Sequence, residues 1–145
     1  MSDHEFDPLK LENQLCFPLY ACSKEVIRRY KPYLDPLDLT YTQYITLLVL
    51  WEKKSVSVKE LGDCLFLDSG TMTPVLKKLE CKGYLTRTRS QEDERNVIVT
   101  LTERGMALRE KAQPIPLQLG SCVPLSPAEA IQLHGLLRKL MSGLK

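Results

Sequence analysis

Residues 57–101, SVKELGDCLFLDSGTMTPVLKKLECKGYLTRTRSQEDERNVIVTL, decide the fold, because helix, turn and strand signals follow one another along them. Ser57 and Glu60 have the spacing of a capping box and predict a short helix that runs to Leu65. A tight turn follows at 66–68, and SGTMTPVLKKLECKG then predicts a second helix that ends at its last glycine. The first half of the stretch is therefore predicted to be two short helices joined by a turn.

The second half of the stretch changes from helical to alternating periodicity. YLTRTR at 84–89 and VIVTL at 97–101 predict two strands, and the polar SQEDERN between them predicts a loop with a charged tip. Helix, turn, helix and hairpin in this order are the layout of a winged helix-turn-helix, whose second short helix enters the major groove of DNA. We therefore predict a DNA-binding fold in which the hairpin is the wing.

Polar and basic side chains lie where this fold would meet DNA. Small hydroxyl donors near the start of a recognition helix suit base edges, and lysines on its later turns suit phosphates. Arg95 at the wing tip is predicted to contact phosphate or the minor groove, with Asp93 holding its guanidinium through a charge-assisted hydrogen bond. For any single lysine, a solvated surface is an equally good interpretation. The candidate DNA-contacting residues are Ser69, Thr71, Thr73, Pro74, Lys77, Lys78, Arg87, Arg89, Asp93 and Arg95.

The segment before this stretch predicts a long helix. Asp7 followed by Pro8 has the residue types of an N-cap and a first helical position, and this helix is expected to run to about Tyr30. Pro18 would lie inside it and kink it, because proline removes a helix hydrogen bond. Cys16 would then lie more than two turns beyond the N-cap, out of reach of the helix dipole.

Three more helices are predicted from cap signals. Thr40 and Ser126 open capping boxes followed by helical patterns over 41–53 and 127–144, and Thr102 opens a helix that the prolines of AQPIP interrupt. The predicted fold class is thus mainly α with a small β-hairpin.

The composition suits one domain without a membrane span. The 145 residues are 43% hydrophobic and 26% charged, which is ordinary for a globular protein. No apolar run approaches the roughly 20 residues that span a bilayer, and the acidic start MSDHEFDPLK does not resemble a signal peptide. We therefore expect a cytoplasmic protein with no membrane partner. A net charge of +2 is too small to indicate nucleic acid by itself, so the distribution of charge carries that prediction.

The cysteines and histidines do not have the pattern of a metal site. Five cysteines, an odd number, cannot all pair within the chain, and none has C-x2-C spacing to another. The histidines His4 and His134 are far apart in the sequence. We expect neither a metal nor another cofactor.

Three segments carry a resemblance to a known family. DERNVIVTLTERG at 93–105 resembles the wing-to-helix signature of the MarR family of dimeric transcription regulators. LENQLCFPLYACSKEVIRRYKPYLDPLDLTYTQY at 11–44 and LFLDSGTMTPVLKKLE at 65–80 resemble the organic hydroperoxide resistance regulators, the OhrR branch of that family.

The resemblance implies an organisation and a function. It implies a single domain, residues 1–145, in which 1–33 and 114–145 are interlocking dimerisation helices around a winged core at 34–113. It implies a homodimer that represses a gene from a pseudo-palindromic operator in double-stranded DNA until an organic hydroperoxide oxidises the protein.

The same resemblance assigns a sensing site. It implies that Cys16 is the redox-sensing residue and that Tyr30 and Tyr41 approach it across the dimer interface. Tyr20, one helical turn after Cys16, is the weaker fourth member of the site. Phenolic O–H groups can stabilise a thiolate without adding a formal charge. Judged from the residues alone, a buried and inert Cys16 would be the more common arrangement.

Oxidised Cys16 requires a second thiol. Cys22 is excluded, because six residues on one helix separate the two cysteines by about 9 Å, beyond the roughly 7 Å limit for a disulfide. In the two-cysteine members of the branch the second cysteine lies in the region of Cys122, so we expect the Cys16 sulfenic acid to condense with Cys122 of the other subunit. A mixed disulfide with a small cellular thiol is the alternative.

Two other functions compete with thiol sensing. One is a MarR-type regulator that a small aromatic or phenolic ligand releases from DNA, with Cys16 inert. The other is a small thiol peroxidase, which is disfavoured because no arginine or threonine motif for peroxide binding accompanies Cys16. We therefore expect a regulator and not an enzyme.

Overall fold

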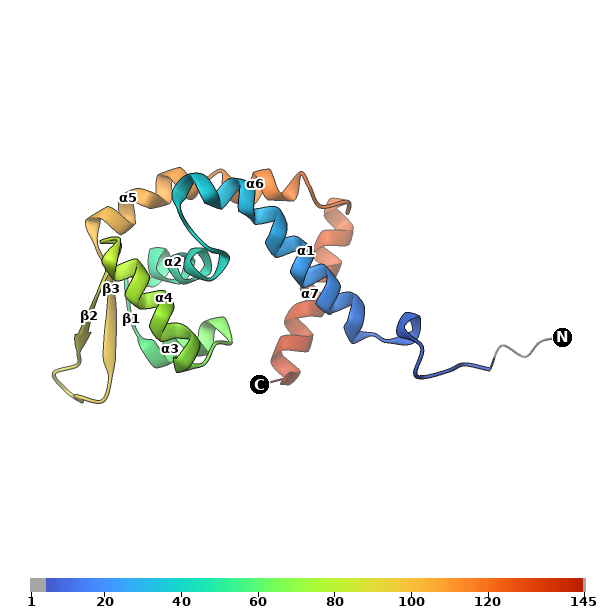
Figure 1. Cartoon of the computed structure of the whole chain (residues 1–145), viewed down its shortest axis with the longest axis horizontal. Coiled ribbons are helices and arrows are strands. Elements are labelled where there is room, and N and C mark those ends of the chain that lie inside the picture. Colours follow the sequence, from blue (N-terminus) through green and yellow to red (C-terminus); the bar gives the residue numbers. More distant parts are fainter. Residues whose placement is uncertain (1–4, 145) are drawn as a thin grey trace. The chain divides into compact units, whose positions relative to one another are not determined.

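Cap signals in the sequence position the helices of the structure, a computed structural model that describes residues 5–144. Residues 1–4 and 145, and with them His4 and the ends of the predicted dimerisation helices, lie outside the described residues. The elements in chain order (Figure 1) are η1 (Leu11–Asn13), α1 (Cys16–Leu34), η2 (Asp35–Leu37), α2 (Tyr41–Lys53), β1 (Ser55–Ser57), α3 (Val58–Leu65), α4 (Ser69–Cys81), β2 (Leu85–Arg89), β3 (Val97–Leu101), α5 (Glu103–Ala112), α6 (Ile115–Gly120) and α7 (Pro127–Leu144). The chain divides into two compact units, the first ending at Ile115 and the second beginning at Pro116.

Two complete capping boxes start α2 and α7. The Gln43 N–H donates to Thr40 Oγ1 at 3.3 Å, and the Thr40 N–H donates to Gln43 Oε1 at 3.1 Å. Ser126 and Glu129 exchange the same two bonds, at 3.2 and 3.0 Å. Hydroxyl caps also start α3 and α5. Because these bonds satisfy N–H groups that a helix start leaves unpaired, the predicted starts are confirmed.

The prediction for the first helix is wrong at both ends. Asn13 and Gln14 direct their side-chain amides to backbone carbonyls of residues 7–10, at 2.6–2.7 Å, which keeps that segment in turns. The helix therefore begins at Cys16, and it continues through Pro32 to Leu34. Pro18 falls in the first turn, where its missing N–H removes no helix bond, so the reason for the predicted kink disappears.

The core of the first unit lies between α2, α3, α4 and the sheet. Leu47, Leu50, Leu61, Met72 and Leu79 are completely buried there. These residues come from the helical stripes of the sequence, so the predicted winged helix-turn-helix is confirmed, with α4 as its second short helix.

A third strand completes the predicted hairpin. β2 and β3 pair antiparallel with Leu85 opposite Leu101, and β1 pairs with the other edge of β3 with Val56 opposite Val99. Val56, Leu85 and Val99 are buried on the inner face. β1 was not predicted, because three residues are too few to show alternation.

The second unit contains α7 and all of α6 except its first residue, Ile115, which belongs to the core of the first unit. The predicted interruption at the prolines is the turn before α6. The sequence does not predict α6 itself, because its Pro116 reads as a helix breaker, whereas the first turn of the helix accommodates it. All of α7 is described, and none of its side chains is buried. Ile131, Leu136 and Leu144 are 64–74% exposed. None of the helices within residues 5–144 is long and apolar enough to cross a membrane.

Replacing Gly105 with alanine is expected to destabilise the first unit. A Cβ at this position would lie 2.2 Å from the carbonyl oxygen of Tyr84 and 2.6 Å from Leu101 Cδ1, and the Gly105 carbonyl accepts the Trp51 indole N–H at 2.9 Å. Such overpacking typically costs about 1–3 kcal/mol. Urea unfolding at a fixed protein concentration would measure the loss. Gly120→Ala is the control, because an added Cβ there would have no neighbouring atom within 4 Å; equal unfolding midpoints for the two variants would contradict the expectation.

Candidate functional site

The solvent-facing side of α4 carries small polar and basic side chains. Asp68 caps the helix, its Oδ1 accepting the Thr71 N–H at 2.8 Å, and this bond holds the pKa of the Asp68 carboxyl below its usual value. The apolar stripe from Met72 to Leu79 is buried on the opposite side. The Thr73 hydroxyl donates to the Ser69 carbonyl at 2.8 Å, so it can only accept from a further donor. The exposed candidates on this side are Ser69, Thr71, Thr73, Pro74, Lys77 and Lys78.

Arg87 joins the wing to α4. Its guanidinium lies 3.1 Å from Glu80 Oε1, and its backbone N–H donates to Glu80 Oε2 at 2.9 Å. Arg87 beside it lowers the pKa of the Glu80 carboxyl, so the pair is charged at neutral pH. The Arg87 side chain is only 28% exposed, which places this predicted DNA-contacting residue in the support of the wing.

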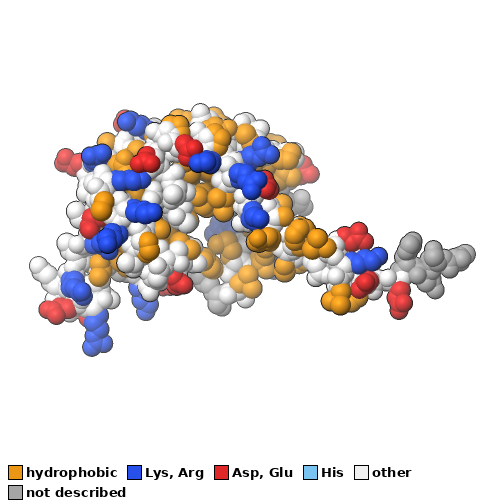
Figure 2. Space-filling model, viewed as in Figure 1, with side chains coloured by type: hydrophobic (Ala, Val, Ile, Leu, Met, Phe, Trp, Pro, Cys, Tyr) orange, Lys and Arg blue, Asp and Glu red, His pale blue; other side chains and the backbone are white. Residues whose placement is uncertain are grey.

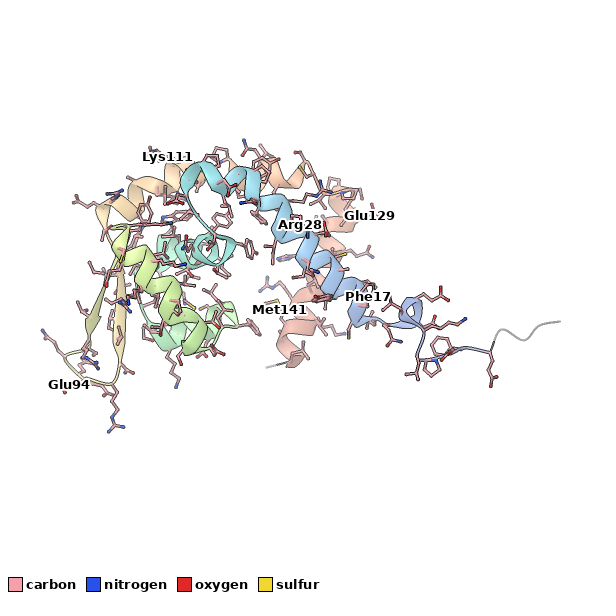
Figure 3. All side chains as sticks on the ribbon, in the orientation of Figure 1. Phe17, Arg28, Glu94, Lys111, Glu129 and Met141 are labelled. Atoms are coloured by element: carbon pink, nitrogen blue, oxygen red, sulfur yellow. The ribbon has the colours of Figure 1, made fainter. Side chains whose placement is uncertain are left out.

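The tip of the wing is ordered by its own side chains. Arg89 donates to the backbone carbonyl of Glu94 at 2.9 Å; Glu94 lies at the tip in Figure 3. Asp93 Oδ1 accepts the backbone N–H of Arg95 at 3.1 Å, and not the guanidinium that was the predicted partner, because a carboxylate two residues away reaches the backbone first. The exposed Arg95 side chain is left at the surface of the wing.

A joint at Gly83 fixes the wing to the end of α4. Gly83 has φ 83°, a left-handed conformation that favours glycine, and it ends the helix as predicted. The Thr102 hydroxyl donates to the Gly83 carbonyl at 2.6 Å, and the Thr102 N–H donates to the Tyr84 carbonyl at 3.1 Å. Thr102 thus connects the end of β3 to the segment between α4 and β2, and it also caps α5.

A groove of about 410 Å³ runs between α3, the start of α4 and the wing. Ser69, Thr73, Arg87 and Arg95 all contribute to its lining, so candidates from the helix and from the wing meet in one place. Lys and Arg side chains are spread over α4 and the wing in Figure 2. The arrangement suits a polyanion that contacts both elements.

Cys16 is exposed and is the first residue of α1. The expectation that it lies more than two turns into the helix is therefore wrong, because α1 begins at this residue. Tyr20, one turn along α1, is 60% exposed, and the Lys24 ammonium lies 5.2 Å from the centre of its ring. Phe17, beside Cys16, marks this end of α1 in Figure 3.

Three tyrosines gather where the end of α1 meets the start of α2. The Tyr30 and Tyr41 rings are 4.9 Å apart, and Tyr44 lies 5.6 Å from Tyr30 and 6.4 Å from Tyr41. Burial, with smaller effects of its two neighbours, raises the pKa of Tyr30 to about 12, and burial also raises the pKa of Tyr41 and Tyr44. All three phenols therefore remain protonated donors at neutral pH.

Tyr44 was missed as a site residue. It was counted in the apolar stripe of its helix, and it is indeed 3% exposed. Its spacing of three residues from Tyr41, which puts both rings on one side of a helix, was the available signal.

Cys16 and Tyr30 are not brought together within one chain. They lie fourteen residues apart on α1, which separates them by about 21 Å along the helix axis. Cys122 lies in the second unit, exposed just after α6, with its sulfur 3.7 Å from the Gln118 carbonyl oxygen. No three His, Cys, Asp or Glu side chains of the described residues gather as metal ligands.

Comparisons with known proteins identify the family. The model of the family described as transcriptional regulator SarA/Rot matches residues 28–112. The organic hydroperoxide resistance transcriptional regulator of Bacillus subtilis is 49% identical over 142 residues, covering 98% of this chain and 97% of that protein.

Solved structures agree with this relationship. AbfR of Staphylococcus epidermidis is similar in its reduced, DNA-bound form, with 36% identity, 92% of each chain covered and a TM-score of 0.79. Its disulfide-formed state covers 92% of this chain and 89% of that one, with a TM-score of 0.61. MarR of E. coli is 29% identical with a TM-score of 0.68, covering 88% of this chain and 96% of that one. The chain belongs to the MarR family of winged-helix transcription regulators, in the branch of the organic hydroperoxide resistance regulators.

Proposed function

We propose that this protein is a cytoplasmic, homodimeric DNA-binding repressor that senses organic hydroperoxides through Cys16. The observation that carries the proposal is the separation of thiol and phenols. Cys16 is exposed at one end of α1, while the half-buried Tyr30 lies about 21 Å along the helix axis toward the other end, with Tyr41 packed against it. A second copy of the chain can supply the phenols that the first cannot. The protein is a regulator and not an enzyme, in keeping with the names of its relatives.

Unpartnered apolar side chains support the homodimer. Over Cys16–Leu34, all of which is described, only Leu34 is buried, and Leu15 just before α1 is 86% exposed. Apolar side chains are visible along α1 in Figure 2, and α7 by itself leaves a similar set in water. Exposed patches of this kind usually mark an interface. We assign dimerisation to 1–33 and 114–145 and DNA binding to the core at 34–113.

The exposed side of α4 and the wing support double-stranded DNA as the partner. Ser69, Thr71 and Thr73 lie at the end of the recognition helix that meets base edges, and Arg95 extends from the wing toward a phosphate or the minor groove. Because a two-fold dimer presents two such helices, the operator is pseudo-palindromic. DNA is held through these groups, while Arg87 and Arg89 hold the wing in shape.

The proposed switch is a two-electron oxidation of Cys16. Its thiolate, which accepts hydrogen bonds from phenols of the partner subunit, attacks a peroxide oxygen. An S–O bond forms, the O–O bond breaks, and the alkoxide takes a proton from solvent and leaves as an alcohol. The Cys122 thiol of the partner subunit then attacks the sulfenic sulfur, forming a disulfide and releasing water. The crosslink pulls on the dimerisation helices and moves the recognition helices out of the operator spacing. AbfR, a relative, has been solved both reduced on DNA and with its disulfide formed.

Substituting Cys16 is expected to abolish release. Wild-type protein treated with an organic hydroperoxide should lose at least about tenfold in operator affinity, because specific binding exceeds non-specific binding by far more than that. Cys16→Ser should keep its affinity, and Cys22→Ser, a second exposed thiol on α1, should still be released. Fluorescence anisotropy with labelled operator measures all three. Equal release of Cys16→Ser and wild type would instead favour the regulator that a small aromatic or phenolic ligand releases.

Substituting Cys122 is expected to remove a covalent dimer. Peroxide-treated wild type should migrate as a crosslinked dimer under non-reducing conditions, and mass spectrometry should find the Cys16–Cys122 peptide pair. Cys122→Ser should remain uncrosslinked while Cys16 is still oxidised. A Cys16 adduct with a small thiol in the wild type, with no crosslink, would establish the one-cysteine alternative.

Arg95→Ala is expected to weaken DNA binding regardless of sequence. Loss of one phosphate contact should lower operator affinity by about tenfold and reduce the slope of log affinity against log salt by about one. Anisotropy titrations at several salt concentrations measure both quantities. Arg109→Ala, an exposed arginine on α5, should change neither. An unchanged slope for Arg95→Ala would remove this residue from the interface.

A further inference from the structure

Lys82 connects the end of the recognition helix to the start of α2. It is the residue that follows α4, and its side chain turns back over the first unit. The Nζ donates to Gln43 Oε1 at 3.3 Å and to the backbone carbonyl of Asp38, and it lies 3.5 Å from Asp38 Oδ2. The side chain is 26% exposed, in contrast to the exposed lysines earlier on α4. The ammonium therefore contacts three oxygen atoms, all of them from residues 38–43, the segment that leads into α2.

The oxygens that Lys82 meets are held in place. Gln43 is 3% exposed, and its Oε1 also accepts the Thr40 N–H of the capping box that starts α2. Asp38 has φ 53°, a left-handed conformation at the end of η2, so its carbonyl direction is set by the turn between α1 and α2. Neither acceptor can follow the lysine without moving the start of α2.

The same turn of α2 carries the sensing phenols. Tyr41 and Tyr44 lie on either side of Gln43 in the sequence, and both rings pack against Tyr30 of α1. A displacement of Tyr30 or Tyr41 therefore shifts the turn to which Lys82 is bonded. On its other side, Lys82 is followed directly by Gly83 and the first residues of the wing.

We propose that Lys82 is a positioning residue that couples the phenol cluster of Tyr30, Tyr41 and Tyr44 to the recognition helix and the wing. The inference rests on the proposed function, since it concerns how oxidation at Cys16 reaches DNA. Rearrangement at the phenols moves the start of α2, and Lys82 passes that movement to the end of α4. Energetic coupling of this type travels through hydrogen-bonded elements that have two arrangements.

A purely stabilising role would be small. α4 is already anchored by Met72, Leu76 and Leu79, which are at most 1% exposed. The Asp38 side chain is 93% exposed, and ion pairs with such exposed partners contribute little to folding. Removing the ammonium should therefore change the response to oxidant more than it changes folding or the reduced state.

Lys82→Met tests the coupling, because methionine keeps an apolar stem and removes the ammonium. Reduced Lys82→Met should bind operator within about threefold of wild type, yet lose less than about threefold on hydroperoxide treatment, where wild type loses at least about tenfold. Sulfenic-acid labelling of Cys16 should proceed at the wild-type rate. Lys82→Arg, which retains a cation that can bridge the same oxygens, should restore most of the response. Lys53→Met is the matched control, since Lys53 makes a 3.1 Å ion pair with Glu60 at the opposite end of α2.

The outcomes separate the two proposals. If hydroperoxide releases Lys82→Met as fully as wild type, or if Lys53→Met loses the response equally, the coupling role is overturned and the proposed function stays intact. Slower Cys16 labelling in Lys82→Met also overturns it, because the lysine would then act on the sensor itself. Wild-type protein that keeps its operator after Cys16 oxidation contradicts the proposed function, and the coupling with it.

Discussion

A helix rises by about 1.5 Å per residue, and this fixed rise separates the two parts of the proposed sensing site. Cys16 begins α1 and Tyr30 lies toward its other end, so side-chain rotation within one chain cannot bring the Cys16 sulfur to the phenol of Tyr30. A symmetric pair of chains satisfies the constraint, because each copy then contributes one thiol and one set of phenols. The uncovered apolar side chains of α1 and α7 are consistent with such a pair.

The basic residues of the DNA-facing region divide into two groups. Arg87 is bonded to Glu80 and fixes the hairpin beside α4, and Arg89 is bonded to the backbone within the wing. Arg95, Lys77 and Lys78 are exposed and can meet phosphates, and the exposed Arg89 keeps further guanidinium N–H groups that can do the same. This division explains how a protein of small net charge can present a local basic surface.

Much of the fold could be predicted because its boundaries are set by local chemistry. Capping boxes at Thr40 and Ser126 and the glycine at 83 act within a few residues, and the structure has them as predicted. The start of α1 could not be predicted from the proline signal, because the amides of Asn13 and Gln14 compete for the carbonyls before it. β1 depends on pairing with a strand about forty residues away, which no local pattern reveals.

The candidate site shows the same limit. The phenol pair of Tyr30 and Tyr41 followed from the family resemblance and lies in one cluster, whereas Tyr44 serves both the core and that cluster and was assigned to the core alone. The sequence correctly predicts that Asp93 bonds to Arg95 but not to which atom, because opposite charges favour the guanidinium whereas the short chain between the two residues favours the backbone N–H. Bonds such as those of Lys82 join segments distant in sequence and are visible only in three dimensions. The joint at Gly83 and Thr102 has a practical meaning for protein engineering. Neither this joint nor the pair of Arg87 with Glu80 uses the exposed residues within 69–78, so that face of α4 can be redesigned for a new operator without refitting the hairpin.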